Sequence, residues 1–236
     1  MTSRYCILLI EDDPAVARSL QAGLEQEGFD PVWKNTGAEG VLYARERHPH
    51  LVLLDVRLPD GLGFDFCRQM RQQGLRQPVI LLTVQQEETD KVLGLEMGAD
   101  DYVTKPFSLR ELVSRIRAQL RRAYGEYSAA QGELLYAGDL VIDQTSGQVR
   151  RGESALSLTP IEFRLLAYLA RHPGQALSRA QILDAVWGYS PDLEAERTVN
   201  VHVRRLREKV ELDPGRPALI LTVPGIGYRL AVKGSQ

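Results

Sequence analysis

Acidic, hydroxyl and ammonium side chains follow four short apolar runs in the first half of the chain. Glu11 and Asp12 follow the first run, Asp55 the third, Thr83 ends the fourth, and Lys105 follows the fifth. Carboxylates brought together repel each other unless a cation is present, and oxygen ligands suit a hard ion such as Mg²⁺. A carboxylate can also attack a phosphoryl group to form an acyl phosphate. Asp55 is therefore the candidate nucleophile, with Thr83 as a hydroxyl donor and Lys105 as a neutralising charge.

These residues belong to a predicted alternation of strands and helices. Apolar runs of strand length are expected at 5–10, 31–34, 51–54, 78–83 and 102–104. Helical patterns are expected at 14–28, 36–47, 62–73, 88–97 and 108–122. The runs 51–54 and 79–82 are apolar throughout, which is typical of parallel strands that are covered on both faces. We therefore predict a five-stranded, doubly wound parallel α/β domain over residues 1–122, with its functional groups at the carboxyl edge of the sheet.

The second half of the chain has a different pattern. Residues 121–133 are polar and rich in small side chains, so we expect a linker, placed at 123–132. Short strands are expected at 140–142, 148–150 and 154–158, followed by helices that begin at Thr159-Pro160 and at Ser178. A third helix over 194–210 and a hairpin over 218–232 complete the pattern. This order predicts an α+β winged helix-turn-helix domain over residues 133–236.

The third predicted helix has one apolar and one basic face. An apolar stripe at helical spacing, which must face a core, consists of Val199, Val203, Leu206 and Val210. Basic surface helices usually only face solvent, but this one follows two helices and precedes a hairpin, which favours a recognition helix. The residues that we expect to contact DNA are Arg197, Thr198, Asn200, Val201, His202, Arg204, Arg205 and, in the hairpin, Arg229.

The composition limits the partners and the compartment. The 236 residues carry a formal charge of −2, which by itself argues against a nucleic-acid partner, so any basic surface must be local. The apolar runs are far shorter than the about 20 residues of a membrane span. The first run is expected to be a strand and not a signal peptide. With only two cysteines, the chain is expected to be cytoplasmic, without disulfides or membrane contact.

The first half resembles the receiver domain of two-component response regulators in Glu11-Asp12, Asp55, Thr83, Tyr102 and Lys105-Pro106. The resemblance implies that a sensor histidine kinase phosphorylates Asp55. It implies that Mg²⁺ is held by Glu11, Asp12, Asp55 and the main-chain carbonyl of Arg57. It further implies a cis peptide bond at Lys105-Pro106, and a switch in which Thr83 moves toward the phosphoryl group while Tyr102 turns inward.

Two positions depart from related patterns. Val84 stands where the receiver family usually has alanine, and its branched side chain is expected to narrow access to the phosphoryl site. Arg57 stands where the aspartyl phosphohydrolases that resemble receivers carry a second acid, which activates the leaving group or water. The arginine favours a persistent phosphoryl switch over an enzyme that turns over substrate.

The second half resembles the winged-helix effector of the OmpR/PhoB subfamily in residues 156–159, Glu162, Val186-Trp187, 197–207 and 225–229. The resemblance implies that the third helix lies in the major groove of double-stranded promoter DNA, where Val201 can meet a thymine methyl group. Pro224 stands where relatives often have an arginine at the wing tip, so no minor-groove contact is expected there. Arg229 is a candidate phosphate contact.

The same resemblance implies further partners. Phosphorylation is expected to promote a homodimer through charges on the last part of the receiver, namely Lys91, Glu96, Asp100, Asp101, Glu111, Arg115 and Arg117. We predict that Lys91 pairs with Glu111, and Asp101 with Arg115, between protomers. The loop at 187–193 is expected to contact RNA polymerase.

The sequence thus favours a phosphorylation-activated transcription regulator that is not an enzyme, and two alternatives stay open. An aspartyl phosphohydrolase would use the same Asp55 and Mg²⁺, although Arg57 and the second domain argue against it. A constitutive DNA-binding protein would use the receiver only to dimerise. Equal DNA affinity with and without a phosphoryl donor would favour that second alternative.

Overall fold

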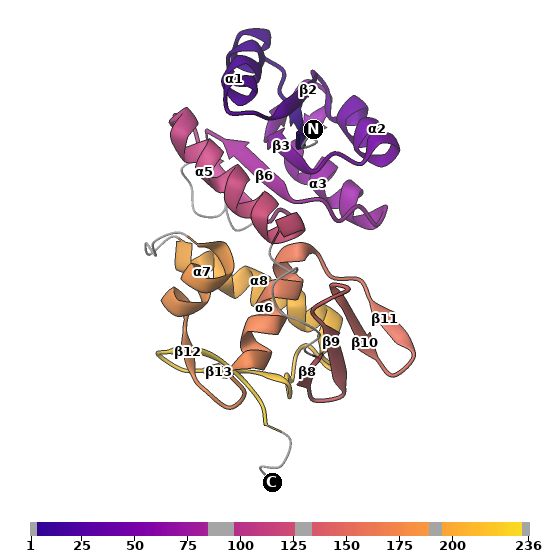
Figure 1. Ribbon diagram of the computed structural model, residues 1–236, viewed down its shortest axis with the longest axis vertical. Helices are drawn as coiled ribbons and strands as arrows, with labels where there is room; N and C mark the ends of the chain where they lie inside the picture. The colour runs from indigo at the N-terminus through magenta and orange to yellow at the C-terminus, as the bar shows by residue number, and fades with distance from the viewer. Residues whose placement is uncertain (1–3, 85–96, 126–133, 189–194, 233–236) are drawn as a thin grey trace. The chain divides into compact units, whose positions relative to one another are not determined.

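The structure is a computed structural model that describes residues 4–84, 97–125, 134–188 and 195–232. The chain divides into two compact units, residues 1–121 and residues 122–236. In Figure 1 the first unit runs from indigo to magenta and the second from orange to yellow. Each unit has its own hydrophobic core.

The first unit is built on a five-stranded parallel sheet in the order β2-β1-β3-β6-β7. The strands are β1 (Cys6–Ile10), β2 (Asp30–Lys34), β3 (Leu51–Asp55), β6 (Val79–Thr83) and β7 (Asp101–Thr104). Strands β3 and β6 are buried along their whole length, as their apolar sequences predicted. The predicted doubly wound α/β fold is therefore confirmed.

Helices cover both faces of this sheet (Figure 1). They are α1 (Pro14–Gln26), α2 (Gly37–Arg47), α3 (Gly63–Gln72) and α5 (Leu109–Leu120). Helices α1 and α5 pack against each other, and their apolar residues join one core cluster with those of β1 and β3. The side chains of Asp13, Thr36 and Ser108 accept backbone N–H groups at the starts of α1, α2 and α5, which fixes where each helix begins. The helix expected at 88–97 falls almost entirely outside the described residues.

The second unit contains an antiparallel sheet followed by three helices and a hairpin. The sheet has the order β11-β10-β9-β8, from β8 (Leu134–Ala137), β9 (Leu140–Asp143), β10 (Gln148–Arg151) and β11 (Ser154–Leu156). The helices are α6 (Pro160–Arg171), α7 (Arg179–Trp187) and α8 (Ala195–Val210). The hairpin of β13 (Ile220–Val223) and β14 (Gly227–Leu230) pairs with β12 (Leu177–Ser178). This is the winged-helix arrangement that the sequence predicted.

Short elements account for the differences from the sequence predictions. Strands β8 and β12 and a small hairpin of β4 (Arg57–Leu58) and β5 (Gly61–Leu62) were not predicted. Each is two to four residues long, so it has too few positions to show a period. A π-helical turn over Arg121–Gly125 also occupies the start of the predicted linker. The rest of that linker, residues 126–132, lies outside the described residues.

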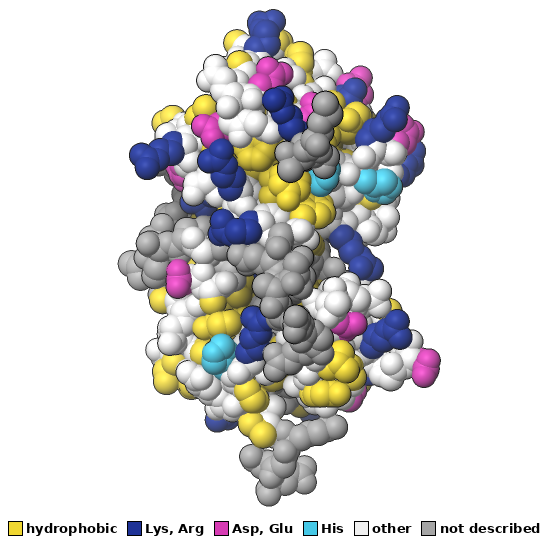
Figure 2. Space-filling view, in the orientation of Figure 1, with side chains coloured by type: hydrophobic (Ala, Val, Ile, Leu, Met, Phe, Trp, Pro, Cys, Tyr) yellow, Lys and Arg dark blue, Asp and Glu magenta, His cyan; other side chains and the backbone are white. Residues whose placement is uncertain are grey.

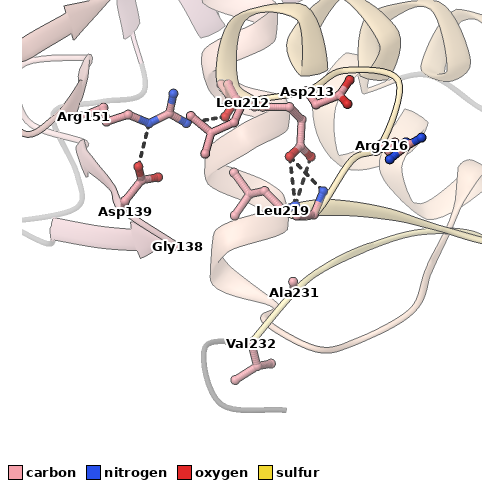
Figure 3. Close-up of a pocket in the computed structure, with 12 residues that line it drawn as sticks. Gly138, Asp139, Arg151, Leu212, Asp213, Arg216, Leu219, Ala231 and Val232 are labelled. Carbon is pink, nitrogen blue, oxygen red and sulfur yellow. Dashed lines mark hydrogen bonds and ion pairs between the residues drawn. The ribbon is translucent and has the colours of Figure 1, made fainter. Parts of the chain in front are cut away.

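The end of α8 and the start of the hairpin line a common pocket (Figure 3), and the carboxylate of Glu211 joins them. It accepts backbone N–H groups of Ala218, Leu219 and Ile220, with the last at 2.8 Å. A cavity of about 360 Å³ lies beside this junction, and Arg151 on its wall donates to the carbonyl of Val210 at 2.5 Å. The bonds that Glu211 accepts fix the direction in which the hairpin leaves α8.

The surface carries no strong charge bias on the face seen in Figure 2, where the described basic and acidic side chains are scattered over both units. This agrees with the formal charge of −2. None of the helices in the described ranges is both long and apolar enough to cross a membrane.

Candidate functional site

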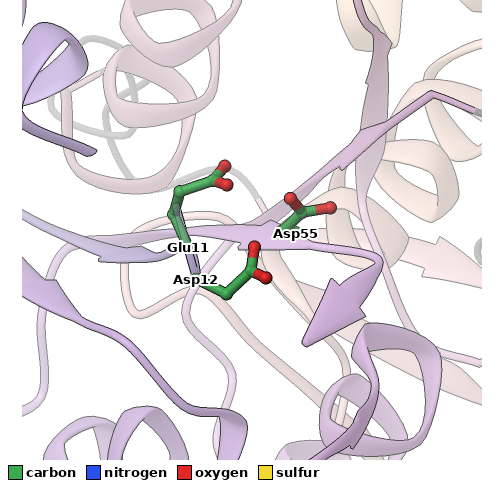
Figure 4. A group of neighbouring side chains, drawn as sticks. All are labelled: Glu11, Asp12 and Asp55. Atoms are coloured by element: carbon green, nitrogen blue, oxygen red, sulfur yellow. The ribbon is translucent and has the colours of Figure 1, made fainter. Parts of the chain in front are cut away.

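Three carboxylates meet at the carboxyl edge of the parallel sheet (Figure 4). Strands β1 and β3 are neighbours, so Glu11 and Asp12 after β1 come next to Asp55 at the end of β3. One carboxylate oxygen from each residue lies within 4.8 Å of the other two. Glu11 and Asp55 are buried, whereas Asp12 is exposed. A donor set made only of carboxylate oxygens, open to solvent on one side, fits a hard cation such as Mg²⁺.

Lys105 joins two of these carboxylates. Its Nζ lies 2.7 Å from Oδ2 of Asp55 and 2.8 Å from Oε2 of Glu11. Burial acts to lower the pKa of Lys105, but the two acidic partners outweigh it and raise that pKa. Burial and the nearby Asp55 raise the pKa of Glu11, against the opposing effect of Lys105. The peptide bond before Pro106 is cis, as the resemblance implied.

The backbone after Asp55 orients its carboxylate. The N–H of Arg57 donates to Oδ1 of Asp55 at 3.1 Å, while Lys105 holds Oδ2. Gly63 lies so close to this segment that a Cβ there would come within 2.1 Å of the Asp55 carbonyl oxygen, so the position requires glycine. Because Oδ1 accepts from the backbone and Oδ2 contacts Lys105, the two carboxylate oxygens of Asp55 have different environments. The carbonyl of Arg57 as a metal ligand stays a prediction.

The predicted switch residues lie on β6, which pairs with β3, and on β7, which pairs with β6. Thr83 is buried at the end of β6, one position beyond Leu82, which pairs with Asp55. Tyr102 is half-buried on β7, where it pairs with Leu81. Val84 is 54% exposed. The structure thus brings Thr83 to the same edge as Asp55 and places Tyr102 further back along the sheet.

Two residues that the sequence analysis did not single out hold the segments around the site. The indole N–H of Trp33 donates to the Glu11 carbonyl at 2.8 Å. Asp60 accepts the N–H groups of Gly37 and Ala38 at 2.9 and 2.8 Å, and these bonds lower its pKa although burial opposes them. Both contacts join segments more than 20 residues apart, so no local motif indicates them.

Helix α8 buries more of its surface than the sequence predicted. Its apolar stripe lies in the core as expected. Four of the predicted DNA contacts are also buried, with exposed fractions of 1% for Thr198, 6% for Val201, 0% for His202 and 8% for Arg205. Their low exposure in the free chain follows from the packing of α8 against both α6 and α7, and contact of these four residues with DNA stays a prediction.

His202 and Arg205 have partners within the second unit. The His202 ring lies edge-on to Trp187, with the ring centroids 4.9 Å apart. Arg205 Nη2 lies 3.1 Å from Oε1 of Glu162, which is fully buried in the first turn of α6. The pattern Thr159-x-x-Glu162 is a capping-box signature, and the structure contains that box. A carboxylate that is buried in the first turn of a helix needs a cationic partner. The capping-box pattern at Thr159 and Glu162 is therefore the signal that could have indicated the pair with Arg205.

The other four predicted DNA contacts differ in how far their side chains are exposed or described. Arg204 and Arg229 are exposed. Asn200 is half-buried, and its Oδ1 accepts from Arg179 at 2.8 Å and from the Tyr228 hydroxyl at 2.9 Å. The side chain of Arg197 lies outside what the structure describes.

The charges assigned to the dimer face mostly have partners within the chain. Asp100 is buried and lies 2.7 Å from Arg71, and its assignment to a dimer interface stays a prediction. Asp101 is also buried and pairs with Arg115 at 3.2 Å within this single chain, and the pair between protomers stays a prediction. The remaining described charges are paired too, Arg115 with Glu111 and Arg117 with Glu27. Lys91 and Glu96 lie outside the described residues.

Comparison with known proteins agrees with this geometry. Residues 7–117 match the response regulator receiver domain, and residues 152–230 match the C-terminal domain of transcriptional regulatory proteins. The DNA-binding response regulator MtrA of Mycolicibacterium smegmatis is 47% identical, over 97% of each chain. The alkaline phosphatase synthesis transcriptional regulatory protein PhoP of Bacillus subtilis is 43% identical, over 95% of each chain.

Solved structures show the same relationship. A mutant of RitR has a TM-score of 0.75 and 28% identity, over 96% of this chain and 98% of that one. The response regulator DrrB, described as a Thermotoga maritima OmpR/PhoB homologue, has a TM-score of 0.50 and 32% identity, over 98% of this chain and 100% of that one. With the paired receiver and winged-helix domains, these relationships show that the chain belongs to the response regulators of the OmpR/PhoB type, phosphorylation-activated regulators of transcription that bind DNA.

Proposed function

We propose that Asp55 accepts a phosphoryl group from a sensor histidine kinase and that this change controls DNA binding by the second unit. The observation that carries the proposal is the contact of Lys105 with both Asp55 and Glu11 at the carboxyl edge of the sheet. A cation at this position can neutralise phosphoryl oxygens when the nucleophile reacts. The backbone N–H of Arg57 donates to Oδ1 of the buried Asp55 and so fixes the direction of its carboxylate.

In the proposed step, a carboxylate oxygen of Asp55 attacks the phosphorus of a phosphohistidine. The P–N bond breaks, the imidazole leaves with the bonding electron pair and takes up a proton, and an acyl phosphate forms on Asp55. Glu11, Asp12, Asp55 and the Arg57 carbonyl would hold Mg²⁺, which neutralises negative charge on the phosphoryl oxygens when bound. Lys105 would exchange its contact with Asp55 for one with the phosphoryl group. Thr83 would donate its hydroxyl, and Tyr102 would turn into the space behind it.

Phosphotransfer is tested by labelling the full chain with radioactive acetyl phosphate in the presence of Mg²⁺. Asp55→Asn should abolish the label, because the amide is a poor nucleophile. Asp13→Asn is the matched control, since Asp13 lies in the same acidic segment but caps α1 through an oxygen that asparagine retains. Label that persists in Asp55→Asn would refute the assignment. Multiple turnover of a phosphomonoester would contradict our expectation that the chain is not an enzyme.

We further propose that α8 and the β13–β14 hairpin contact promoter DNA. Arg204 on α8 and Arg229 on β14 are the exposed arginines among the predicted contacts that the structure describes. Arg204 lies 3.6 Å from Glu208, a pair so exposed that it costs little to separate. Since DNA-binding regulators work inside the cell, this role supports a cytoplasmic location.

DNA binding is tested by measuring affinity for promoter fragments at several salt concentrations. Arg204→Ala should weaken specific binding by about 1–3 kcal/mol if Arg204 contacts a base, and should weaken binding to all sequences equally if it contacts a phosphate. Glu208→Ala removes the neighbouring acid and should not weaken binding. Unchanged affinity of Arg204→Ala at every salt concentration would contradict the proposed contact.

Phosphorylation is proposed to favour a receiver homodimer and a contact of the 187–193 loop with RNA polymerase. The charges Glu111 and Arg115 on α5 are partly exposed and pair within the chain, so dimerisation would require them to exchange partners. Sedimentation of the full chain with and without beryllofluoride, which mimics the phosphoryl group, tests the dimer. A protein that stays monomeric at micromolar concentration with beryllofluoride bound would contradict it.

A further inference from the structure

The backbone N–H and carbonyl of Glu11 are both bound by residues of strand β2. The N–H of Glu11 donates to the Lys34 carbonyl at 3.1 Å. The carbonyl of Glu11 accepts the indole N–H of Trp33 at 2.8 Å. Because a peptide unit is planar, fixing this carbonyl also fixes the plane that joins the two carboxylate-bearing residues.

We propose that Trp33 is a positioning residue for the divalent cation site. Its indole N–H fixes the carbonyl of Glu11 and, through the peptide plane, the positions of the Cα atoms from which the side chains of Glu11 and Asp12 extend. The inference rests on the proposed function, because it concerns the cation that Glu11, Asp12 and Asp55 would hold.

The physical reason for such an anchor lies in the charge of the site. Three carboxylates with an oxygen each within 4.8 Å of the others repel one another in the absence of the cation. An unrestrained segment would move Asp12, the exposed member, away from Asp55, and the cation would then have to reorder it on binding. A restraint present before binding removes that cost and so tightens binding.

Trp33 is suited to this role because its ring is itself anchored. The side chain is half-buried and packs against the core cluster formed by β1, β3 and the helices α1 and α5. The donor is therefore fixed by packing on one side while its N–H reaches the Glu11 carbonyl on the other. An exposed donor of the same kind would spend part of its time bonded to water.

A second set of hydrogen bonds joins the segment after Trp33 to the segment that follows Asp55. The amides that open α2, at residues 37 and 38, bind both carboxylate oxygens of Asp60. Asp60 lies in the β4–β5 hairpin, five positions after Asp55. Residues 33–38 thus connect the segment that carries Glu11 and Asp12 to the segment that follows Asp55.

The test separates the N–H group from the bulk of the ring. Trp33→Phe removes the donor and part of the ring, whereas replacement of Trp33 by 3-benzothienylalanine keeps the bicyclic shape and removes only the donor. Binding of Mn²⁺ to the full chain is followed by electron paramagnetic resonance of the free ion. Trp187→Phe is the matched control, because Trp187 is the only other tryptophan and lies in the core of the second unit.

We expect both Trp33 variants to bind Mn²⁺ about threefold to tenfold more weakly, the effect of losing one hydrogen bond. The Mg²⁺ concentration for half-maximal phosphorylation by acetyl phosphate should rise by a similar factor, while the rate at saturating Mg²⁺ stays within about twofold. Trp187→Phe should leave Mn²⁺ affinity unchanged.

Wild-type Mn²⁺ affinity in the 3-benzothienylalanine variant would overturn the inference, even if Trp33→Phe binds weakly because it is less stable. A lower rate at saturating Mg²⁺ with an unchanged half-maximal concentration would also overturn it. Failure of the proposed function looks different, since the wild-type chain would then bind no Mn²⁺ and accept no label at Asp55.

Discussion

The buried ion pair between α6 and α8 offers a decisive test of how the second unit is held together. Glu162 is fully buried, and its Oε1 lies 3.1 Å from Arg205. Its Oε2 lies 2.5 Å from Lys209 and 2.8 Å from the N–H of Thr159. We predict that Glu162→Met destabilises this unit strongly, whereas the double variant Glu162→Met/Arg205→Met recovers most of the loss.

The magnitude follows from the partners that are left behind. Removing one member of a buried pair costs about 3–5 kcal/mol, because the other charge stays buried without its partner. Loss of the capping box costs about 1 kcal/mol more. Lys209 is about one-third exposed, and its contact contributes at most about 1 kcal/mol. The single variant should therefore lose about 4–7 kcal/mol, while apolar replacement of both partners avoids the unpaired charge.

Urea unfolding of the full chain measures this loss. Trp187 reports on the second unit, because it is fully buried there and contacts His202, and a Trp33→Phe background removes the other indole signal. A loss below about 1 kcal/mol in Glu162→Met would refute the estimate, since it would fall to the level of an exposed pair. The reasoning also fails if the double variant is less stable than Glu162→Met.

The same variants decide what Arg205 does. If the buried ion pair with Glu162 is the only role of Arg205, the folded double variant should bind DNA with wild-type affinity. A double variant that is stable but loses specific DNA binding would support the role that the sequence predicted for Arg205. Arg204→Ala in the same assay gives the effect of removing the contact that we propose for Arg204.

The pH dependence of this pair has a definite sign. Burial acts to raise the pKa of Glu162, but Arg205 and Lys209 outweigh it and hold that pKa below its usual value. A lowered folded-state pKa contributes stability above the unfolded value of about 4.3, and this stability is lost as the pH falls through the folded value. The difference in unfolding free energy between wild type and Glu162→Met should therefore be constant near pH 7 and shrink only below about pH 4.3.

Three further substitutions probe the first unit, each measured by thermal or urea unfolding of the full chain. Arg71→Met should cost about 3–5 kcal/mol, because Arg71 pairs with the buried Asp100 and also donates to three backbone carbonyls; a loss similar to that of the exposed-pair control Arg68→Met would contradict it. Asp60→Ala should cost about 1 kcal/mol at pH 7, and the loss should vanish as the pH falls through the lowered pKa of Asp60; a loss that grows in acid would have the wrong sign. His48→Gly should stabilise the unit by about 0.5–1 kcal/mol, because His48 ends α2 in the left-handed region at φ 47°; an equal gain in His48→Ala would refute the backbone explanation.

Most of the carboxylate site was predictable because its residues follow strands of one parallel sheet. The apolar runs that end at Asp55 and Thr83 predict buried parallel strands, and such strands end at one common edge. The gathering of Glu11, Asp12, Asp55 and Lys105 at one edge follows from their places after these strands, whereas their close approach depends on the strand order, which puts β1 beside β3. The contacts of Trp33 and Asp60 were not predictable, because they join segments whose spacing in the sequence has no period.

Helix α8, the predicted recognition helix, shows the limit of the sequence. Its apolar period identified the core stripe, and its place after two helices identified the winged-helix fold. The sequence does not distinguish a basic side chain that faces DNA from one that faces a buried acid. Only the packing of α8 against α6 and α7 decided that Arg205 pairs with Glu162 while Arg204 stays exposed, because neighbours brought together by folding determine which charges are removed from water.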